Sequence, residues 1–234
     1  MPKESVALIA ESPTLPVLWH NVVRAFRLEG FLAGSFHPLR GFESVPAIRP
    51  ITFGYQRDTL QLYLDREFYA LDATPRAIMP SGKVMTWREA WESLHLTADE
   101  QQFWNDLQIA GSDQGLSLPC YGPKQRNAYV TLSRHDRDRQ FDLGERRWLQ
   151  VLAQTAHMRL CELLFTADAA VTLSPREKEI LHWVALGKSN SVISQLVRIS
   201  GATVDTHLRR IFSKMGVADR TSAAIKAIGL GLIH

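Results

Sequence analysis

Residues 173–191 read LSPREKEILHWVALGKSNS, and this stretch decides the fold of the last quarter of the chain. It opens with a capping box, in which the Ser174 hydroxyl caps a helix, Pro175 suits the first helical position and Glu177 reaches back to the cap. Apolar residues then recur at helical spacing until Gly187, which can close a helix in the left-handed conformation. The stretch therefore predicts a helix that starts at Ser174 and ends near Gly187.

Three further helices are expected after it. The sequence predicts a short helix over 191–197, a tight turn, a longer helix between Ser200 and Gly216, and a last helix capped by Asp219. In the third helix the apolar stripe points away from Arg209 and its neighbours, which leaves a polar and basic face. Two helices joined by a four-residue turn, the second of them basic and exposed, are typical of a helix-turn-helix that fits the DNA major groove.

Positive charge is concentrated in the same part of the chain. Residues 169–234 hold nine Lys and Arg against four Asp and Glu, whereas residues 1–168 hold eighteen against twenty. The net charge of +3 is thus the sum of +5 over residues 169–234 and −2 over residues 1–168. This asymmetry predicts a polyanion-binding module attached to a domain with another task. A plain four-helix domain with a solvated basic face is the alternative.

The opening stretch, followed by ISGATVDTHL at 199–208 and IFSKMGV at 211–217, closely resembles the LuxR-type DNA-binding domain over nearly all of 173–233. Glu177, Leu181 and Gly187 stand at the three most characteristic positions of that family. The resemblance implies a four-helix helix-turn-helix domain that binds double-stranded promoter DNA.

The chemistry of DNA gives the exposed side chains their expected roles. Arg209 can fork to O6 and N7 of guanine, which is worth about 1 to 3 kcal/mol of discrimination. The resemblance puts Asp205 at a base-facing position, where its carboxylate can accept from cytosine N4. Phosphate contacts are expected from Arg210, Lys188 and Lys214, and contacts with phosphate or a thymine methyl from Thr203 and Thr206.

The composition excludes several classes of protein. Apolar residues at 45% and charged residues at 22% exclude a disordered chain. No apolar run approaches the roughly 20 residues that cross a bilayer, and the start does not resemble a signal peptide, so a cytoplasmic protein is expected. Cys120 and Cys161 are predicted to be buried thiols, the histidines lack metal-ligand spacing, and neither a metal nor a cofactor is expected.

Residues 1–165 alternate helix-like and strand-like segments. Helices are expected at 15–29, 57–68, 87–93, 98–110 and 143–165, and strands at 31–37, 48–55, 84–86, 115–121 and 129–134. These predict an α+β domain, an α-β-α sandwich around a mostly antiparallel five-stranded sheet, with a small-molecule pocket between sheet and helices. The predicted domains are 1–165 for signal binding and dimerisation, a linker at 166–172, and 173–234 for DNA binding.

The first domain resembles the LuxR-type autoinducer-binding domain, because Tyr63, Asp72, Trp87 and Gly115 fall at its spacings and LSLP continues the strand after the glycine. The resemblance implies an N-acyl homoserine lactone as ligand. It assigns polar contacts to Asp72 and Tyr63, an aromatic wall to Trp87, a contact with the head of the acyl chain to Thr131, and chain-lining positions near Leu107 and Ser112.

The sequence departs from that family at two positions. Thr59 stands where the lactone-binding tryptophan is expected, and Ala73 follows Asp72 where proline is usual. Losing an indole donor removes one hydrogen bond, about 0.5 to 1.5 kcal/mol, and an apolar lid over the ring. Thr59 can donate directly or through water. A regulator that answers to a non-lactone signal, or acts without one, is therefore the alternative.

The same residues also have structural interpretations. Without the family spacing, Tyr63 and Trp87 would be core aromatics, whereas a carboxylate such as Asp72 in an apolar run needs a donor from protein or ligand. The charged cluster at 134–139 is expected to be a solvated loop.

The function predicted from these features is that of a ligand-responsive transcription regulator of quorum sensing. The long segment 143–165 carries a wide apolar stripe that suits a homodimer, and a dimer would bind a palindromic promoter site. RNA polymerase is a further candidate partner. A phosphorylation receiver is excluded because no early βα unit ends in paired acids, and an enzyme because no nucleophile elbow or metal-ligand spacing occurs. The sequence does not decide between activation and repression.

Overall fold

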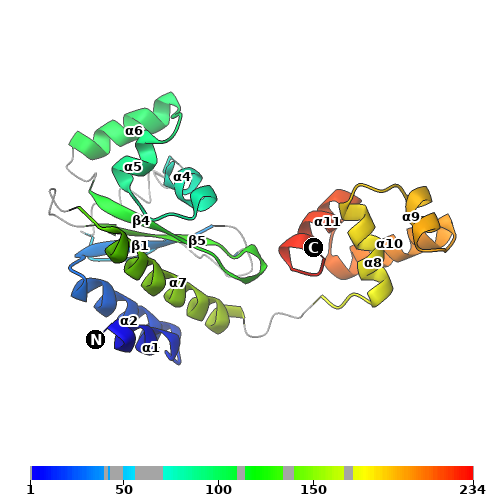
Figure 1. Cartoon of the computed structure of the whole chain (residues 1–234), viewed down its shortest axis with the longest axis horizontal. Helices are drawn as coiled ribbons and strands as arrows, with labels where there is room; N and C mark the ends of the chain where they lie inside the picture. Colours follow the sequence, from blue (N-terminus) through cyan, green and yellow to red (C-terminus); the bar gives the residue numbers. More distant parts are fainter. Residues whose placement is uncertain are drawn as a thin grey trace. The chain divides into compact units, whose positions relative to one another are not determined.

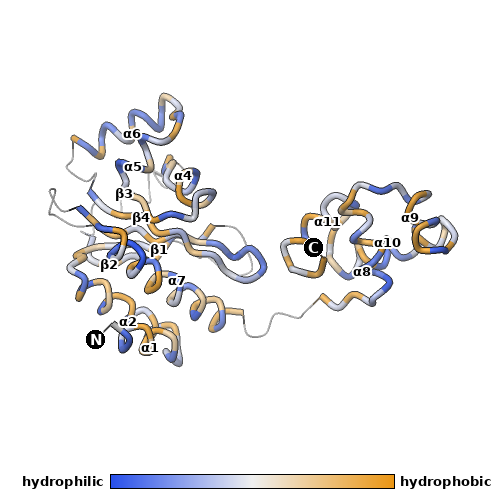
Figure 2. Tube along the Cα trace, viewed as in Figure 1, coloured by the Kyte–Doolittle hydropathy of each residue, from blue (hydrophilic) through white to orange (hydrophobic). Residues whose placement is uncertain are grey.

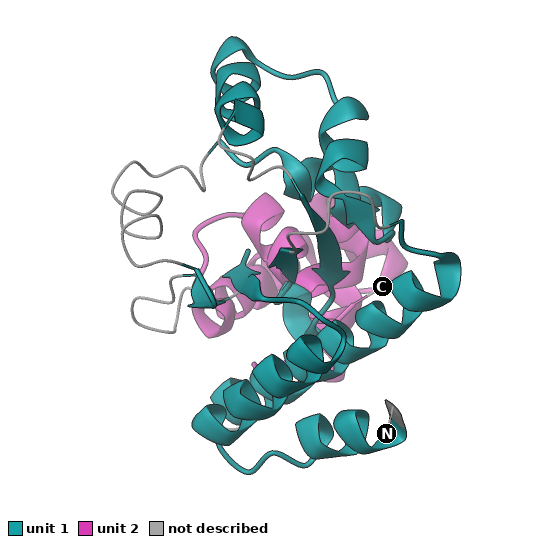
Figure 3. Ribbon diagram, turned by 90° about the vertical axis from the view of Figure 1, so that its left-hand side faces the viewer, with its two compact units in different colours: residues 1–166 teal, residues 167–234 magenta. Residues whose placement is uncertain are grey.

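The computed structural model describes residues 2–39, 42, 50–55, 71–109, 114–133, 140–165 and 171–233. Contacts divide the chain into two compact units, residues 1–166 and 167–234, which Figure 3 colours separately. Each unit has an apolar core of its own. None of the described helices is long and apolar enough to span a membrane.

The first unit is a sheet between two layers of helices (Figure 1). Its helices are α1 (Pro2–Ala10), α2 (Leu15–Leu28), α4 (Thr74–Ser81), α5 (Trp87–Glu92), α6 (Ala98–Ile109) and α7 (Leu143–Phe165), with a short 3-10 turn, η2 (Pro123–Gln125). Its strands are β1 (Ala33–Pro38), β2 (Ile51–Phe53), β3 (Met85–Thr86), β4 (Gly115–Cys120) and β5 (Ala128–Ser133). They join in the order β2-β1-β5-β4-β3, and every pair is antiparallel. The predicted α-β-α sandwich is confirmed.

The two faces of this sheet carry different side chains, because successive residues of a strand point to opposite sides. Phe36, Val130 and Leu118 pair across β1, β5 and β4 and join the core under α2 and α7. The next row, Ser35, Thr131 and Ser117, lies on the other face, which α4, α5 and α6 cover (Figure 1). One face is therefore apolar and the other carries buried hydroxyls.

Helix α7 packs along the apolar face with a narrower stripe than the sequence suggested. Its buried residues are Leu149, Leu152, Ala153, His157 and Cys161, which recur at helical spacing. Figure 2 shows hydrophilic and hydrophobic segments alternating along this helix. The wide apolar stripe predicted over 143–165 includes Val151, which is 46% exposed in the structure. Both cysteines are buried free thiols, as predicted.

Two helices of the first unit were not expected from the sequence. Helix α4 contains Pro75 near its start and Pro80 inside, so its sequence resembles a loop. It ends at Gly82, whose φ of 65° is left-handed. Helix α1 is short and lies at the start of the chain. The helix expected at 57–68 and the charged cluster at 134–139 fall outside the described residues.

The second unit consists of α8 (Pro175–Ala185), α9 (Asn190–Leu196), α10 (Gly201–Met215) and α11 (Arg220–Gly229), as the sequence predicts. In the predicted capping box, Glu177 Oε2 accepts from the Ser174 backbone N–H at 2.7 Å, and Ser174 Oγ accepts from the Glu177 N–H at 3.2 Å. Ser200 and Asp219 cap α10 and α11 through their side chains, and Gly216 ends α10 in the left-handed conformation. Local sequence signals thus set the starts of α8, α10 and α11 and the end of α10.

Candidate functional site

A buried polar row crosses the sheet beneath α4, α5 and α6. Ser35 Oγ lies 2.6 Å from Thr131 Oγ1 and 2.6 Å from His37 Nε2. The hydroxyl of Tyr55, two residues after β2, hydrogen-bonds to Ser35 and Thr131. Ser117 stands opposite Thr131 in the ladder and extends the row to β4. We call Ser35, His37, Tyr55, Ser117 and Thr131 the polar row.

Asp72 is tied to this row through Tyr129. The Tyr129 hydroxyl donates to Asp72 Oδ2 at 2.7 Å, and the Thr74 backbone N–H donates to Oδ1 at 2.9 Å. The Tyr129 ring stacks on His37 with centroids 4.5 Å apart and an interplanar angle of 12°. A carboxylate offers about four acceptor positions, and two donors to Asp72 are identified among the described residues, so Asp72 can accept a further N–H.

Trp87 borders the site where α5 begins. The Thr86 and Glu89 capping box starts the helix at this residue. Its indole lies so close to Gly115 that a Cβ there would be 2.5 Å from Trp87 Cε2 and 2.5 Å from the Leu132 carbonyl oxygen. A glycine is therefore needed for the indole to lie against β4.

Two buried polar atoms of this region lack a partner among the described residues. They are Trp87 Nε1 and Ser117 Oγ. A buried donor without an acceptor costs about 1 to 3 kcal/mol, so such atoms are uncommon in native proteins. Both can bond to a polar group of a molecule bound between the sheet and the helices.

The helices above the polar row supply an apolar layer. Trp91 stacks on Trp104 with centroids 5.1 Å apart, and its Nε1 donates to Thr74 Oγ1 at 3.1 Å. Leu107 is partly buried against this layer. The other members of the layer are Ala73, Ala77, Ile78, Ala90 and Phe103. The site thus combines an apolar wall with a few placed polar groups, as ligand sites generally do.

The electrostatics of the site suit an uncharged polar ligand. Burial lowers the pKa of His37 to about 4, although the nearby charge of Asp72 acts to raise it, so the ring is neutral at physiological pH. Burial raises the pKa of Tyr55, which keeps its hydroxyl protonated. The site therefore offers one carboxylate acceptor and several neutral donors, and it can recognise an amide N–H together with carbonyl oxygens.

The structure brings four predicted ligand residues to the same side of the first unit, namely Asp72, Trp87, Gly115 and Thr131, with Leu107 in the apolar layer. Thr59, Tyr63 and Ser112 fall outside the described residues. Sequence reasoning missed Ser35, His37, Tyr55, Ser117 and Tyr129. The alternation of polar and apolar residues along β1, β4 and β5 is the signal that could have found those on the strands.

The second unit presents the predicted DNA-contacting residues on its surface. Lys188, Thr203, Asp205, Thr206, Arg209 and Arg210 are all exposed. Within the described ranges, neither Arg209 nor Arg210 forms an ion pair, so both guanidinium groups are available. Asp205 accepts a hydrogen bond from Asn190 Nδ2, which links α9 to α10.

Lys214 has a carboxylate partner inside its own unit. Its Nζ lies 2.7 Å from Glu177 Oε2, and the Glu177 side chain is only 4% exposed. Burial acts to raise the pKa of Glu177, but hydrogen bonds from Lys214 and Ser174 and the charge of Lys214 hold it below its ordinary value. The Lys214 side chain, which is 44% exposed, thus joins α10 to α8, and its contact with phosphate stays a prediction.

Metal ligation has no support in the described part of the chain, where no three His, Cys, Asp or Glu side chains gather around one point. The absence of a cofactor stays a prediction.

Comparisons with known proteins cover both units. Residues 15–160 match the family described as "Autoinducer binding domain", and residues 171–227 match "Bacterial regulatory proteins, luxR family".

Individual proteins show the same likeness. The putative HTH-type transcriptional regulator y4qH of Sinorhizobium fredii is 34% identical over 150 residues, which span 63% of this chain and 46% of that protein. The transcriptional activator protein SolR of Ralstonia solanacearum is 28% identical over 76% of each chain. The crystal structure of Escherichia coli SdiA superposes with a TM-score of 0.70 at 22% identity, covering 100% of this chain and 98% of SdiA, which shows a shared fold.

Proposed function

The chain belongs to the LuxR family of quorum-sensing transcription regulators, with an autoinducer binding domain and a LuxR-type helix-turn-helix, and from this we propose that it binds an N-acyl homoserine lactone on the polar row. The family consists of regulators and not of enzymes, in line with the prediction from the sequence. The proposal adds the ligand, the dimer and the palindromic DNA site.

The observation that carries the proposal is the set of polar groups around Asp72. Its carboxylate can accept the amide N–H of an acylated signal. Trp87 Nε1 and Ser117 Oγ are buried and lack partners among the described residues, so each can bond to a carbonyl oxygen of the ligand. The apolar layer that includes Trp104 and Leu107 suits an acyl chain. One ligand with an amide, carbonyl oxygens and an aliphatic tail meets all these groups.

The proposal assigns Trp87 a second role because Thr59 replaces the expected tryptophan. A lactone carbonyl that lacks an indole donor at position 59 can accept from Trp87 Nε1 instead. The net value of one such hydrogen bond is about 0.5 to 1.5 kcal/mol, which corresponds to roughly a three- to tenfold change in affinity.

Thermal unfolding of the full chain against a panel of acyl homoserine lactones of varied chain length tests the proposal. A ligand that binds only the native state stabilises it by about 2.7 kcal/mol at a hundred times its dissociation constant. We expect one lactone to raise the unfolding temperature and Asp72→Ala to abolish the rise. Asp106→Ala is the matched control, because Asp106 is exposed on α6 and its carboxylate bonds to Gln102. A rise that survives Asp72→Ala would refute the assignment.

A second candidate function is favoured by Thr59 alone. With threonine at this position the site loses a donor and an apolar lid, which weakens a lactone more than a signal without a ring carbonyl. The same panel therefore includes aryl and unrelated acylated signals. Stabilisation by one of these, and by no lactone, would make the chain a regulator of a different signal.

The second unit is proposed to bind promoter DNA. We place the protein in the cytoplasm as a homodimer on a palindromic promoter site, with α10 in the major groove and RNA polymerase as a neighbour. The exposed Arg209 and Arg210 and the net charge of +5 over residues 169–234 support DNA binding. Sedimentation with and without a DNA duplex that carries two half-sites measures whether two copies bind it.

A further inference from the structure

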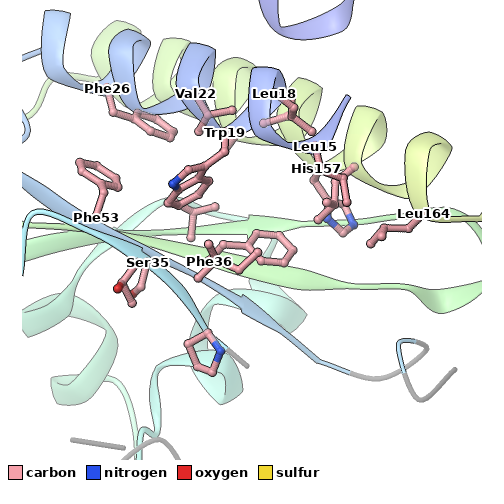
Figure 4. A pocket seen from close by; sticks show the side chains of 17 residues that line it. Leu15, Leu18, Trp19, Val22, Phe26, Ser35, Phe36, Phe53, His157 and Leu164 are labelled. Atoms are coloured by element: carbon pink, nitrogen blue, oxygen red, sulfur yellow. The ribbon is translucent and has the colours of Figure 1, made fainter. Parts of the chain in front are cut away.

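A cavity of about 590 Å³ lies between α2, α7 and strands β1, β2 and β5, and Ser35 is the one member of the polar row among its lining residues (Figure 4). Its volume falls within the range of about 300 to 1,000 Å³ that is usual for ligand pockets. The walls are almost entirely apolar, with Trp19, Val22 and Phe26 from α2 and Ala156 from α7 among the lining residues. Of the residues that the proposed lactone site uses, Ser35 alone also lines this cavity.

His157 supplies an imidazole to this wall, and Ser35 and Thr52 supply hydroxyl groups. His157 is 1% exposed, and Figure 4 shows its imidazole near Leu15 and Leu164. His157 Nε2 lies 2.6 Å from the Arg126 carbonyl oxygen. Because a carbonyl oxygen only accepts, Nε2 carries the proton and Nδ1 presents a lone pair. That lone pair is buried and has no partner in the described part of the chain.

The wall restricts the charge of an occupant. No charged side chain is among the residues that line the cavity. Burial lowers the pKa of His157, despite its hydrogen bond to the Arg126 carbonyl, so its ring is neutral. A carboxylate or an ammonium group placed here would lose its hydration without gaining a counter-ion. The occupant must therefore be uncharged and mostly apolar.

The cavity also reaches the surface. Leu15 and Ile51 both line it, and they are 40% and 37% exposed, respectively. A chain-like molecule can enter between the start of α2 and strand β2 and lie along the apolar face of the sheet.

We propose that this cavity is a second ligand site, for an uncharged single-chain lipid whose hydroxyl head donates a hydrogen bond to His157 Nδ1. A long-chain primary alcohol is the simplest member of that class. Its tail would lie against Trp19 and Phe36, and its hydroxyl would supply the donor that the buried Nδ1 lacks. The two sites share Ser35, but Asp72, which the lactone needs, does not line this cavity.

Quenching of tryptophan fluorescence tests occupancy, and Trp19→Phe separates the signal of the cavity residue from that of the other five tryptophans. The probe is a straight-chain undecanol with a terminal bromine, because bromine quenches a nearby indole, and the full-length protein is titrated with it. We expect saturable quenching that disappears in Trp19→Phe and persists in Asp72→Ala. Asp72→Ala is expected to lose lactone binding, so failure of the two sites is distinguishable. Quenching that is absent, or unchanged in Trp19→Phe, would overturn the proposal.

A cavity-filling variant tests the location. Ala156→Leu places a larger side chain in the cavity and should weaken the alcohol at least tenfold. Val151→Leu is the matched control on the same helix, because Val151 is 46% exposed and is not among the lining residues. Equal affinity in Ala156→Leu and Val151→Leu would place the alcohol elsewhere.

The head group is tested by comparing the alcohol with its methyl ether, which cannot donate. The native protein should prefer the alcohol by about three- to tenfold, the value of one hydrogen bond. His157→Gln can still donate to the Arg126 carbonyl, and we expect it to reduce that preference. If His157→Gln fails to fold, the alcohol-to-ether ratio of the native protein still decides. A ratio near one would refute the role of His157.

Discussion

Gly115 shows how one residue can set a binding site. Its missing Cβ leaves room for the Trp87 indole and for the Leu132 carbonyl oxygen, both of which a methyl group would approach to 2.5 Å. Because the carbonyl belongs to the neighbouring strand, it cannot yield as a side-chain end can. We expect Gly115→Ala to cost about 1 to 3 kcal/mol of stability and to displace Trp87, with loss of the lactone-induced rise in unfolding temperature.

The control for Gly115→Ala is Gly201→Ala, where a new Cβ would meet nothing within 4 Å. Thermal unfolding with and without ligand measures both variants. Ligand stabilisation that is equal in the two variants would contradict the close approach of Trp87 to β4.

Glu177 makes the second unit sensitive to acid. Its pKa lies below the ordinary value in the folded state, so the carboxylate stabilises the unit above its unfolded pKa of about 4.3. This stabilisation is lost as the pH falls below that value and through the lower folded pKa. Glu177→Gln should make the free energy of unfolding of the second unit depend less on pH in this range, as measured by unfolding at a series of pH values.

Lys214→Ala tests the same pair at neutral pH. Removing the ammonium leaves a nearly buried carboxylate with only the capping bonds, so we expect faster hydrogen exchange in α8 and a loss of about 1 to 3 kcal/mol. Lys178→Ala is the control, because Lys178 is exposed on α8, the helix that carries Glu177. Unchanged exchange in Lys214→Ala would show that the pair contributes nothing.

Single residues were predictable from sequence where their partners are local. The caps at Ser174, Ser200 and Asp219 bond to backbone groups three residues ahead, and the sequence identifies all three. The bond from Tyr129 to Asp72 joins residues 57 apart, and the pair of Lys214 with Glu177 joins residues 37 apart. Only tertiary packing decides such partners, so the sequence indicates a phosphate contact for Lys214 but not its pairing with Glu177.

At the scale of elements, periodicity predicted the five strands but not the layer that covers each face. Alternation along β5 separates Thr131 from Val130 and Leu132, which indicates two unlike faces. It does not say which helices cover them, because that depends on connections far apart in sequence. Helix α4 was not predicted because Pro75 and Pro80 are typical of loops. In the structure α4 packs against β4, and the sequence alone does not show this tertiary packing.

Arg209 on α10 and Lys188 before α9 are expected to affect DNA binding in different ways. Arg209 is exposed and can form a bidentate contact with guanine, so Arg209→Ala should cost about 1 to 3 kcal/mol on the specific site and little on random DNA. Lys188 lies between α8 and α9 and is expected at a phosphate. Lys188→Ala should weaken all sequences alike and lower the slope of log affinity against log salt by about one.

Binding titrations on specific and scrambled duplexes at several salt concentrations measure both effects. Lys178→Ala is the control for a lost charge on an exposed face. If Arg209→Ala and Lys188→Ala lost equal affinity on both duplexes, α10 would not be the helix that reads bases.

At the scale of the whole molecule, the two units have separate cores and opposite net charges, so each can fold around its own residues. A signal that binds the first unit can change DNA binding only if the two ligands prefer the same state of the protein. We propose a dimer as that state, because two recognition helices on half-sites about one helical turn apart bind together.

Coupling between the lactone and DNA must be reciprocal, whatever structural change connects the two sites. If the lactone raises the affinity for a two-half-site duplex by some factor, the duplex must raise the affinity for the lactone by the same factor. Titrating lactone with and without saturating duplex, and duplex with and without saturating lactone, measures both factors. Asp72→Ala should abolish the lactone's effect and leave the protein's own affinity for DNA unchanged. Changing the spacing between the half-sites by half a helical turn should abolish the coupling in the native protein. The two half-sites then face different sides of the duplex, so the two recognition helices cannot bind them together. Coupling that survives the half-turn shift would mean that the signal acts on each copy alone.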